Sequence, residues 1–242
     1  MPFPLCLFTS SFFLSLLAGE HSPSGLPRAN VEASVVQLLA IGPGSGDKNH
    51  TCAATGFMVN EDGVILTNAH VVEDARRCLA ASPTGKIVAK FPAPGKRTAT
   101  AVSCDVVALD DLHDLALLKP ERPIERAHAH AALDVREPAA GTAVSVTGHS
   151  ASAWQPITQK GTILRRGQLP LADNDPEKTE VLILDIPLQR GASGSPVYLD
   201  SGAVVGIVSR QNPSRPSETV AVPIRYAIDL LDLQGLRWHG RR

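Results

Sequence analysis

The chain has 242 residues, 43% of them hydrophobic, and its 23 basic and 24 acidic side chains leave a net charge of −1. This balance argues against a nucleic-acid partner, because binding to phosphates needs a surplus of basic residues. The 19 glycines and 19 prolines exclude a helical bundle and favour many short elements joined by turns.

The chain begins with an apolar run, 5–18, that is followed by Gly19 and Glu20. The run is too short for a membrane-spanning helix, which needs about 20 residues. It ends in small residues, as a secretory signal does. We expect a signal peptide over 1–19, a flexible segment over 20–30, and a periplasmic or secreted mature chain without a membrane span. No Lys or Arg precedes the run, so an uncleaved anchor and a chain that is not exported both stay open.

From about Val31 onward, short apolar runs rich in β-branched residues alternate with turn residues, which is typical of an all-β protein. Helical spacing of apolar residues occurs only near the end, after Pro223. The expected strands are 56–59, 64–67, 78–81, 87–89, 101–109, 115–118, 143–147, 157–164, 181–185, 203–209 and 220–224.

Two polar stretches interrupt these strands. A linker-like stretch, 120–132, divides the strands into two similar sets and predicts two β-subdomains. The stretch 171–180 holds several acidic residues without the spacing of a calcium loop, so we expect a solvated loop there.

The cysteines indicate a disulfide rather than a metal site. Removal of the signal segment with Cys6 leaves Cys52, Cys78 and Cys104, none of them in the C-x-x-C spacing of a zinc site. We expect Cys78 and Cys104 to lie in neighbouring strands of a hairpin, within bridging distance. Other pairings and free thiols stay open.

Three segments carry residues suited to nucleophilic catalysis. His70 follows directly after an expected strand, Asp114 opens another, and Ser193 lies in a glycine-flanked turn between two more. A serine hydroxyl becomes an effective nucleophile when an imidazole takes its proton, and the imidazole needs a carboxylate to orient it. The spacing allows His70 and Asp114 to lie on one subdomain and Ser193 on the other, with the site between them.

Other candidates are weaker. Asp105, Asp110 and Asp111 lie near Asp114 but do not lead directly into the strand that follows it. The His128-x-His130 pair lacks further ligands, so we expect no metal and no cofactor. His149 follows a strand end; we expect it at the surface, and a place in the lining of the cleft stays open as the alternative.

The motifs resemble those of the trypsin-like (chymotrypsin-fold) serine peptidases, nearest the HtrA/Deg branch. Segment 56–72 is similar to the histidine segment of that branch, 114–119 to the strand that opens with the aspartate, and 191–196 to the nucleophile motif. Segments 204–209 and 221–224 are similar to the substrate-pairing strand and to the end of the domain.

The resemblance implies an all-β fold of two six-stranded antiparallel β-barrels with a C-terminal helix. Its peptidase domain would cover 31–236, with barrel one at about 31–120, barrel two at about 131–224 and the helix at about 224–233. The printed sequence ends soon after that helix, and we expect no PDZ domain.

The resemblance also implies the role of each site residue. Ser193 would be the nucleophile, His70 the general base and Asp114 its orienting acid, while backbone N–H groups of Gly191 and Ser193 would form the oxyanion hole. The chain departs from the common motif at two positions: Ala192 stands where the family commonly has Asn or Asp, and Ser195 stands where it commonly has Gly. Ser195 occurs in some branches, including glutamate-specific relatives.

The expected substrate-binding residues are Pro187, Leu188, Arg190 and Ser209. Pro187 stands where a trypsin-type enzyme carries an acid, so basic P1 residues should be rejected, because a buried cation without a partner is costly. Leu188 favours small or medium aliphatic P1 residues. An acidic P1 residue is the rival, since Arg190 or Arg210 offers positive charge.

The sequence therefore predicts an exported serine endopeptidase that acts on unfolded or extended polypeptides through an acyl-enzyme intermediate. A catalytically silent peptide-binding module and an esterase are the alternatives. Polypeptide substrates are the expected partners, and the sequence predicts no particular oligomeric state.

Overall fold

The computed structural model describes residues 28–42, 52–91, 100–124, 129–150, 155–171 and 178–241. The expected signal peptide, most of segment 20–30, His128 and much of the 171–180 loop lie outside these residues. Within them, no helix has the length and apolar character needed to cross a membrane.

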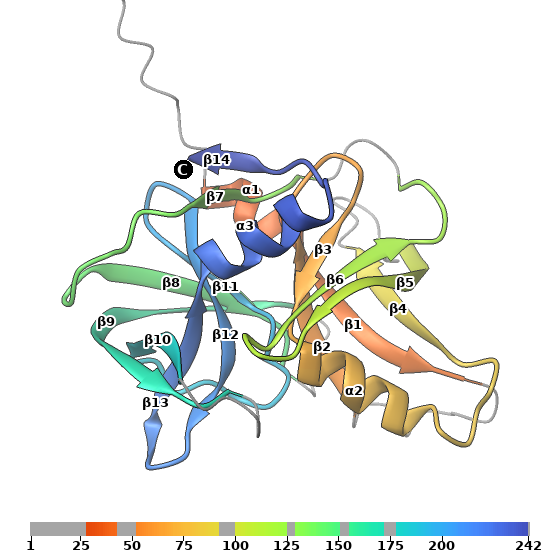
Figure 1. Ribbon diagram of the computed structural model, residues 1–242, viewed down its shortest axis with the longest axis horizontal. Coiled ribbons are helices and arrows are strands. Elements are labelled where there is room, and N and C mark those ends of the chain that lie inside the picture. The colour runs from red at the N-terminus through yellow and green to blue at the C-terminus, as the bar shows by residue number, and fades with distance from the viewer. Residues whose placement is uncertain are drawn as a thin grey trace, which may run out of the picture.

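Six antiparallel strands close the first barrel, in the order β1-β2-β3-β6-β5-β4 (Figure 1). Its interior is filled by large buried side chains such as Leu38, Ile65 and Phe91. The strands are β1 (Val35–Ile41), β2 (Ala53–Met58), β3 (Ile65–Thr67), β4 (Lys86–Phe91), β5 (Thr100–Asp110) and β6 (Leu115–Pro120).

The second barrel has the strand order β11-β8-β9-β10-β13-β12 and is closed by pairing of β11 with β12. Its strands are β8 (Ala143–Gly148), β9 (Ile157–Leu169), β10 (Thr179–Leu184), β11 (Pro196–Tyr198), β12 (Ala203–Asn212) and β13 (Arg215–Pro223). Two short strands, β7 (Ala132–Asp134) and β14 (His239–Arg241), extend this sheet in parallel beside β12. The prediction of two six-stranded antiparallel barrels is thus confirmed.

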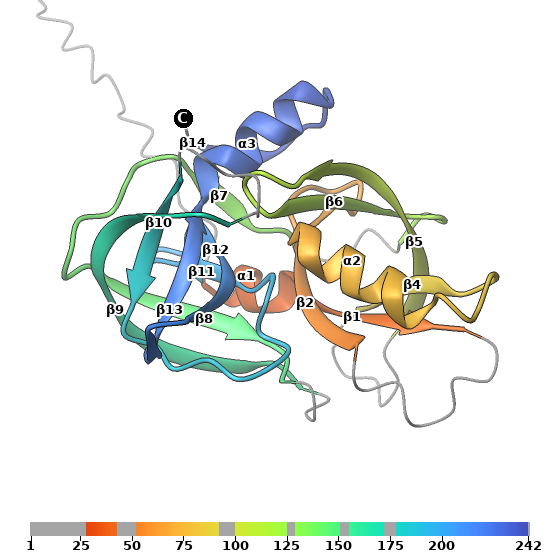
Figure 2. The same cartoon turned by 60° about the horizontal axis from the view of Figure 1, so that its bottom comes forward.

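Three helices accompany the barrels. The expected C-terminal helix is present as α3 (Ile224–Leu233), whereas α1 (Arg28–Ser34) and α2 (Ala69–Cys78) were not predicted. Helix α2 lies across the first barrel (Figure 2). It buries Ala69, Val72 and Ala75, which are three residues apart and therefore lie on one face of the helix. The expected strand 78–81 is therefore wrong, because its first residue ends α2 and the other three form a turn.

The disulfide also differs from the expected one. Cys52 and Cys78 are bonded, with their Cα atoms 6.6 Å apart, and Cys104 is a buried free thiol in β5. The expected Cys78–Cys104 bridge is wrong because Cys78 belongs to α2 and not to a strand beside β5. The observed bond fastens the end of α2 to the start of β2.

Candidate active site

The three candidate catalytic residues come from both barrels. His70 is the second residue of α2, and Asp114 ends the turn between β5 and β6, so both belong to the first barrel. Ser193 lies in the turn that leads from the second barrel's β10 toward β11. The first barrel thus supplies a base and an acid, and the second supplies a hydroxyl.

His70 and Asp114 are joined by several hydrogen bonds. The imidazole Nδ1 of His70 lies 2.9 Å from both carboxylate oxygens of Asp114, and the backbone N–H of His70 donates to Oδ1 at 3.0 Å. Ser209 Oγ donates to Oδ2 at 2.6 Å, and Asn68 Nδ2 donates to the carbonyl of Asp114 at 2.9 Å. The buried carboxylate is therefore held in one orientation, with its charge directed at the imidazole.

This environment changes the proton affinity of His70. Burial disfavours the charged imidazolium, but the hydrogen bond and the charge of Asp114, aided by Asp74, outweigh burial and raise the pKa of His70 above its usual value. The positive charge of Arg210 acts in the opposite direction. His70 is therefore a stronger base than an isolated histidine.

Asp114 is singled out among the acids of this turn. The carboxylate of Asp110 contacts His113, with Oδ2 2.7 Å from Nδ1, and none of the described contacts links it to His70. The choice of Asp114 over its neighbours therefore agrees with the distances.

Ser193 is held within its own barrel. Its Oγ donates to the carbonyl of Ser209 at 2.9 Å, and none of the hydrogen bonds among the described residues joins it to His70. Gly191 and Gly194 have φ values of 96° and 84°, in the left-handed region that favours glycine. A Cβ on Gly194 would also collide with the carbonyl oxygen of Thr55, so the turn requires glycine there.

The N–H groups of Gly191 and Ser193 are available to an incoming group, because neither donates to an acceptor within the described part of the chain. The carbonyl of Gly191 accepts from Thr55 Oγ1 at 2.8 Å, and the carbonyl of Ser193 accepts from the N–H of Thr55 at 3.0 Å. Thr55 thus fixes both peptide units of the turn that carries Ser193.

One cavity brings His70 and Ser193 together. It has a volume of about 190 Å³ and is lined by residues of both barrels, including Asp74, Arg190 and Gly191. Asp74 and Arg190 place one negative and one positive side chain at this cavity. A chain segment entering it meets the imidazole on one side and the serine turn on the other.

The other expected substrate-binding residues are divided between two places. Leu188 is buried in a neighbouring cavity of about 60 Å³, where it lies with His149 and Ala192. Pro187 is exposed and lines neither of these cavities. The hydroxyl of Ser209 is directed at Asp114 and not toward a pocket.

Sequence reasoning misplaced or missed two residues that lie beside the candidate site. Thr55 is fully buried, and its Oγ1 also accepts a hydrogen bond from the N–H of His149 at 2.9 Å. The only signal for it was a polar residue in an apolar strand. His149 is 6% exposed, so the expectation that it lies at the surface is wrong. Its N–H bond to Thr55 draws it into the interior between the barrels.

Comparison with known proteins agrees with this architecture. The family model of the trypsin-like peptidase domain matches residues 54–207, and the chain belongs to this family. The active form of the Rv3671c protease from M. tuberculosis superposes with a TM-score of 0.67 at 21% identity, covering 87% of this chain and 85% of that one.

Two relatives have similar sequences. Bovine mitochondrial serine protease HTRA2 is 30% identical over 176 residues, which is 71% of this chain and 34% of that protein. Serine endoprotease DegS of Haemophilus influenzae is 26% identical over 191 residues, which is 73% of this chain and 48% of that protein. The resemblance to HtrA-type serine proteases is thus confirmed, and the chain spans about a third to a half of these relatives' length.

Proposed function

We propose that this chain is a serine endopeptidase that hydrolyses unfolded or extended polypeptides through Ser193, His70 and Asp114. The observation that carries the proposal is the shared cavity, where His70, already bonded to Asp114, faces the turn of Ser193. Two of its relatives, HTRA2 and DegS, are named as a serine protease and a serine endoprotease, which supports the same chemistry.

In the proposed mechanism, Ser193 exchanges its bond to the Ser209 carbonyl for one to His70 and attacks the scissile carbonyl. His70 takes the hydroxyl proton and passes it to the leaving amine, which leaves an acyl-enzyme on Ser193. Water then attacks the ester with His70 again as base. The N–H groups of Gly191 and Ser193 donate to the oxyanion in both steps, each such donor being worth about 3 kcal/mol in comparable enzymes.

The proposed substrate preference is a small or medium aliphatic residue at P1. Leu188 is apolar and lines the cavity of about 60 Å³ together with Ala192. No carboxylate is among the described residues that line this cavity, so a Lys or Arg side chain bound there would lack a partner. The Nε2 of Gln211 donates to the backbone carbonyl of Leu188 at 2.9 Å and holds that residue in place. A peptide library with a dominant Lys or Arg preference would contradict this assignment.

We further propose that the peptidase domain covers 31–236 and that the protein is exported to the periplasm or secreted after removal of 1–19. One relative is named as a probable periplasmic serine endoprotease, which supports this location. Fractionation and N-terminal sequencing of the expressed full chain would test it, and a chain retained intact in the cytosol would contradict it.

The activity is tested by incubating the purified protein with an unfolded polypeptide and following new amino termini over time. We expect cleavage by the wild type and none by Ser193→Ala. Equal cleavage by both proteins would exclude Ser193 as the nucleophile.

One observation favours a silent peptide-binding module as the second candidate, since Ser193 Oγ donates to Ser209 and not to His70. That candidate predicts binding of extended peptides by the wild type without cleavage. The same assay separates the two, because a folded wild type that binds the polypeptide and leaves it intact supports the silent module.

A further inference from the structure

Asp114 has an unusual backbone conformation that its neighbours must maintain. Its φ is 55°, in the left-handed region that residues with a Cβ adopt only at a cost. The hydrogen bond from Asn68 fixes the backbone carbonyl of Asp114. The backbone on the N-terminal side of Asp114 depends on the preceding residue of the turn, His113.

His113 is held on two sides. Its N–H donates to Asp110 Oδ1 at 3.1 Å, and its Nδ1 lies 2.7 Å from Asp110 Oδ2. Its ring stacks on Tyr226, with the ring centroids 4.1 Å apart and the planes 19° apart. We call Asp110, His113 and Tyr226 the turn clamp.

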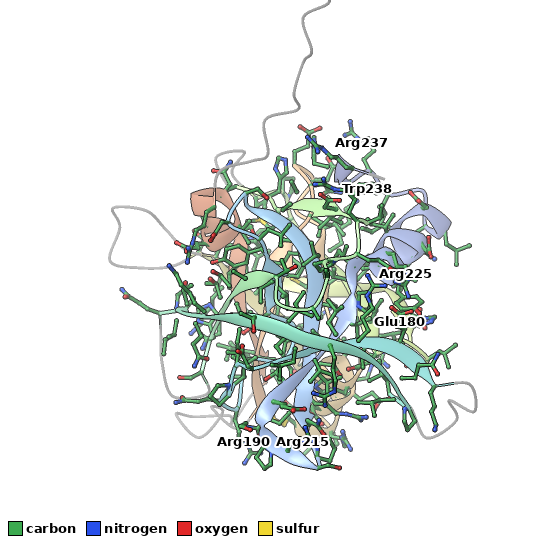
Figure 3. All side chains as sticks on the ribbon, turned by 90° about the vertical axis from the view of Figure 1, so that its left-hand side faces the viewer. Glu180, Arg190, Arg215, Arg225, Arg237 and Trp238 are labelled. Carbon is green, nitrogen blue, oxygen red and sulfur yellow. A yellow bond between two sulfur atoms is a disulfide. The ribbon has the colours of Figure 1, made fainter. Side chains whose placement is uncertain are left out.

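Tyr226 joins this turn to the C-terminal helix and the second barrel. It lies in α3, and the guanidinium of the adjacent Arg225 lies 4.6 Å from its ring centroid and donates to its hydroxyl at 3.1 Å. Arg225 is itself paired with Glu180 of β10 at 3.2 Å (Figure 3). The turn that carries Asp114 therefore belongs to the first barrel but is held by the second.

A second contact crosses the same boundary. Thr179 Oγ1, at the start of β10, donates to the carbonyl of Leu112 at 3.2 Å. The turn is thus fixed by a ring stack at His113 and by a hydrogen bond one residue earlier. Thr179 belongs to the barrel that also carries Ser193, and Tyr226 to the helix that directly follows the last strand of that barrel, β13.

We propose that His113 and Tyr226 are positioning residues that hold Asp114 against His70 by tying its turn to the C-terminal helix α3. Loss of the stack lets the turn relax toward an unstrained φ, which draws the carboxylate away from the imidazole. The inference rests on the proposed function for its kinetic consequence, but the hydrogen bond between Asp114 and His70 is measurable without a substrate.

The kinetic test compares Tyr226→Leu with Tyr226→Phe, which keeps the ring and is the matched control. We expect kcat to fall about 10- to 100-fold in Tyr226→Leu with KM unchanged, because small misplacements of a catalytic assembly have effects of this size. Tyr226→Phe should stay within about twofold of the wild type. In Tyr226→Leu the apparent pKa of His70 should also decrease, since Asp114 raises it. The other charges that act on His70, Asp74 and Arg210, are the same in all three proteins.

A substrate-free test follows the proton on His70 Nδ1 by NMR. We expect a downfield, slowly exchanging resonance in the wild type and in Tyr226→Phe, and its upfield shift or loss in Tyr226→Leu. A wild type that cleaves no peptide contradicts the proposed function, while this resonance still decides the role of the clamp. Identical resonances in the three proteins would contradict the proposed role of the turn clamp in positioning Asp114.

Thermal unfolding establishes that each variant is folded. If Tyr226→Leu does not fold, His113→Ala, with His113→Phe as the control that keeps the stack, tests the other partner. We expect the same loss of kcat and of the Nδ1 resonance in His113→Ala only. Equal behaviour of His113→Ala and His113→Phe would overturn the role of the stack.

Discussion

The two barrels supply their parts of the site in different states. In the first barrel, His70 and Asp114 are already hydrogen-bonded, Ser209 donates to the Asp114 carboxylate, and Asn68 donates to its backbone carbonyl. In the second, the hydroxyl of Ser193 is bonded to the carbonyl of Ser209. The pair of His70 and Asp114 is therefore assembled without a substrate, whereas in the proposed mechanism Ser193 must exchange a hydrogen bond before it reacts.

This difference separates two kinds of variant. Changes around Asp114 alter the basicity of His70, and changes around the nucleophile turn alter the approach of Ser193 and the oxyanion donors. The first kind should change the pH dependence of the rate, and the second should lower the rate at every pH.

The largest effect is expected for Ser193→Ala. Removal of the nucleophile should lower kcat by about 10⁶-fold, as in other triad enzymes. The side chain donates a single hydrogen bond, so the free energy of unfolding should change by about 1 kcal/mol or less. Steady-state kinetics and urea unfolding measure the two quantities. Retention of activity would show that another residue is the nucleophile.

Asp114→Asn should have the next largest effect. The amide preserves the shape of the side chain but removes the charge and stabilises the wrong tautomer of His70, so kcat should fall by about 10⁴-fold. The measured pKa of His70 should decrease as well, because the Asp114 carboxylate raises it. Asp111→Asn, at an exposed acid of the same turn, is the matched control, and an equal loss of kcat in the control would show that Asp114 is not the orienting acid.

Reduction of the disulfide should destabilise the barrel that carries the acid–base pair. The bond joins residues separated by 26 positions, and the removal of such a cross-link lowers the free energy of unfolding by about 3 kcal/mol. Unfolding of the Cys52→Ala/Cys78→Ala double variant measures this loss, with Cys104→Ala as the control for a cysteine outside the bond. Non-reduced peptide mapping should recover a Cys52–Cys78 peptide, and recovery of Cys78–Cys104 would contradict the structure.

Thr55→Val should lower the rate through the nucleophile turn. The variant keeps the volume of the side chain but removes the bonds to Gly191 and His149, so we expect kcat to fall about 10- to 100-fold at every pH. Thr147→Val removes a buried hydroxyl that bonds Thr158 and Tyr198, away from the turn, and should leave kcat unchanged. Equal kinetics of the two variants would exclude Thr55 from the site.

The smallest effect concerns pH. His70 must be neutral to act as a base, and its pKa is raised, so kcat/KM should increase with pH through a midpoint above 6.5 and then reach a plateau. The raised pKa of His70 also adds to the free energy of unfolding. This contribution is complete at pH values below the pKa of His70 in the unfolded chain, and it is lost as the pH rises through the pKa of His70 in the folded protein. A rate maximum near pH 4 would contradict a histidine base.

The sequence predicted the parts of this molecule that depend on local patterns. The continuous apolar runs of β6 and β12 and the turn around Ser193 each carry their signal within a few residues. Helix α2 was missed because most of its short apolar face lies within the histidine segment 56–72. The wrong strand at 78–81 then led to the wrong disulfide.

Contacts between distant residues were not predictable in this way. Thr55 bonds Gly191, which is 136 positions away, and Ser209 bonds Asp114, which is 95 positions away. No spacing rule within one sequence joins such pairs, because the closure of two barrels brings them together. The resemblance to a known family identified the reacting groups but not these supporting contacts.

Covalent labelling of the nucleophile is the most direct test of the proposed mechanism. The purified protein is treated with a fluorophosphonate at a pH above the pKa of His70, and the labelled residue is identified by peptide mass spectrometry. The proposal predicts a single adduct on Ser193 in the wild type and none in Ser193→Ala. A folded wild type without an adduct, or an adduct that persists in Ser193→Ala, would contradict it.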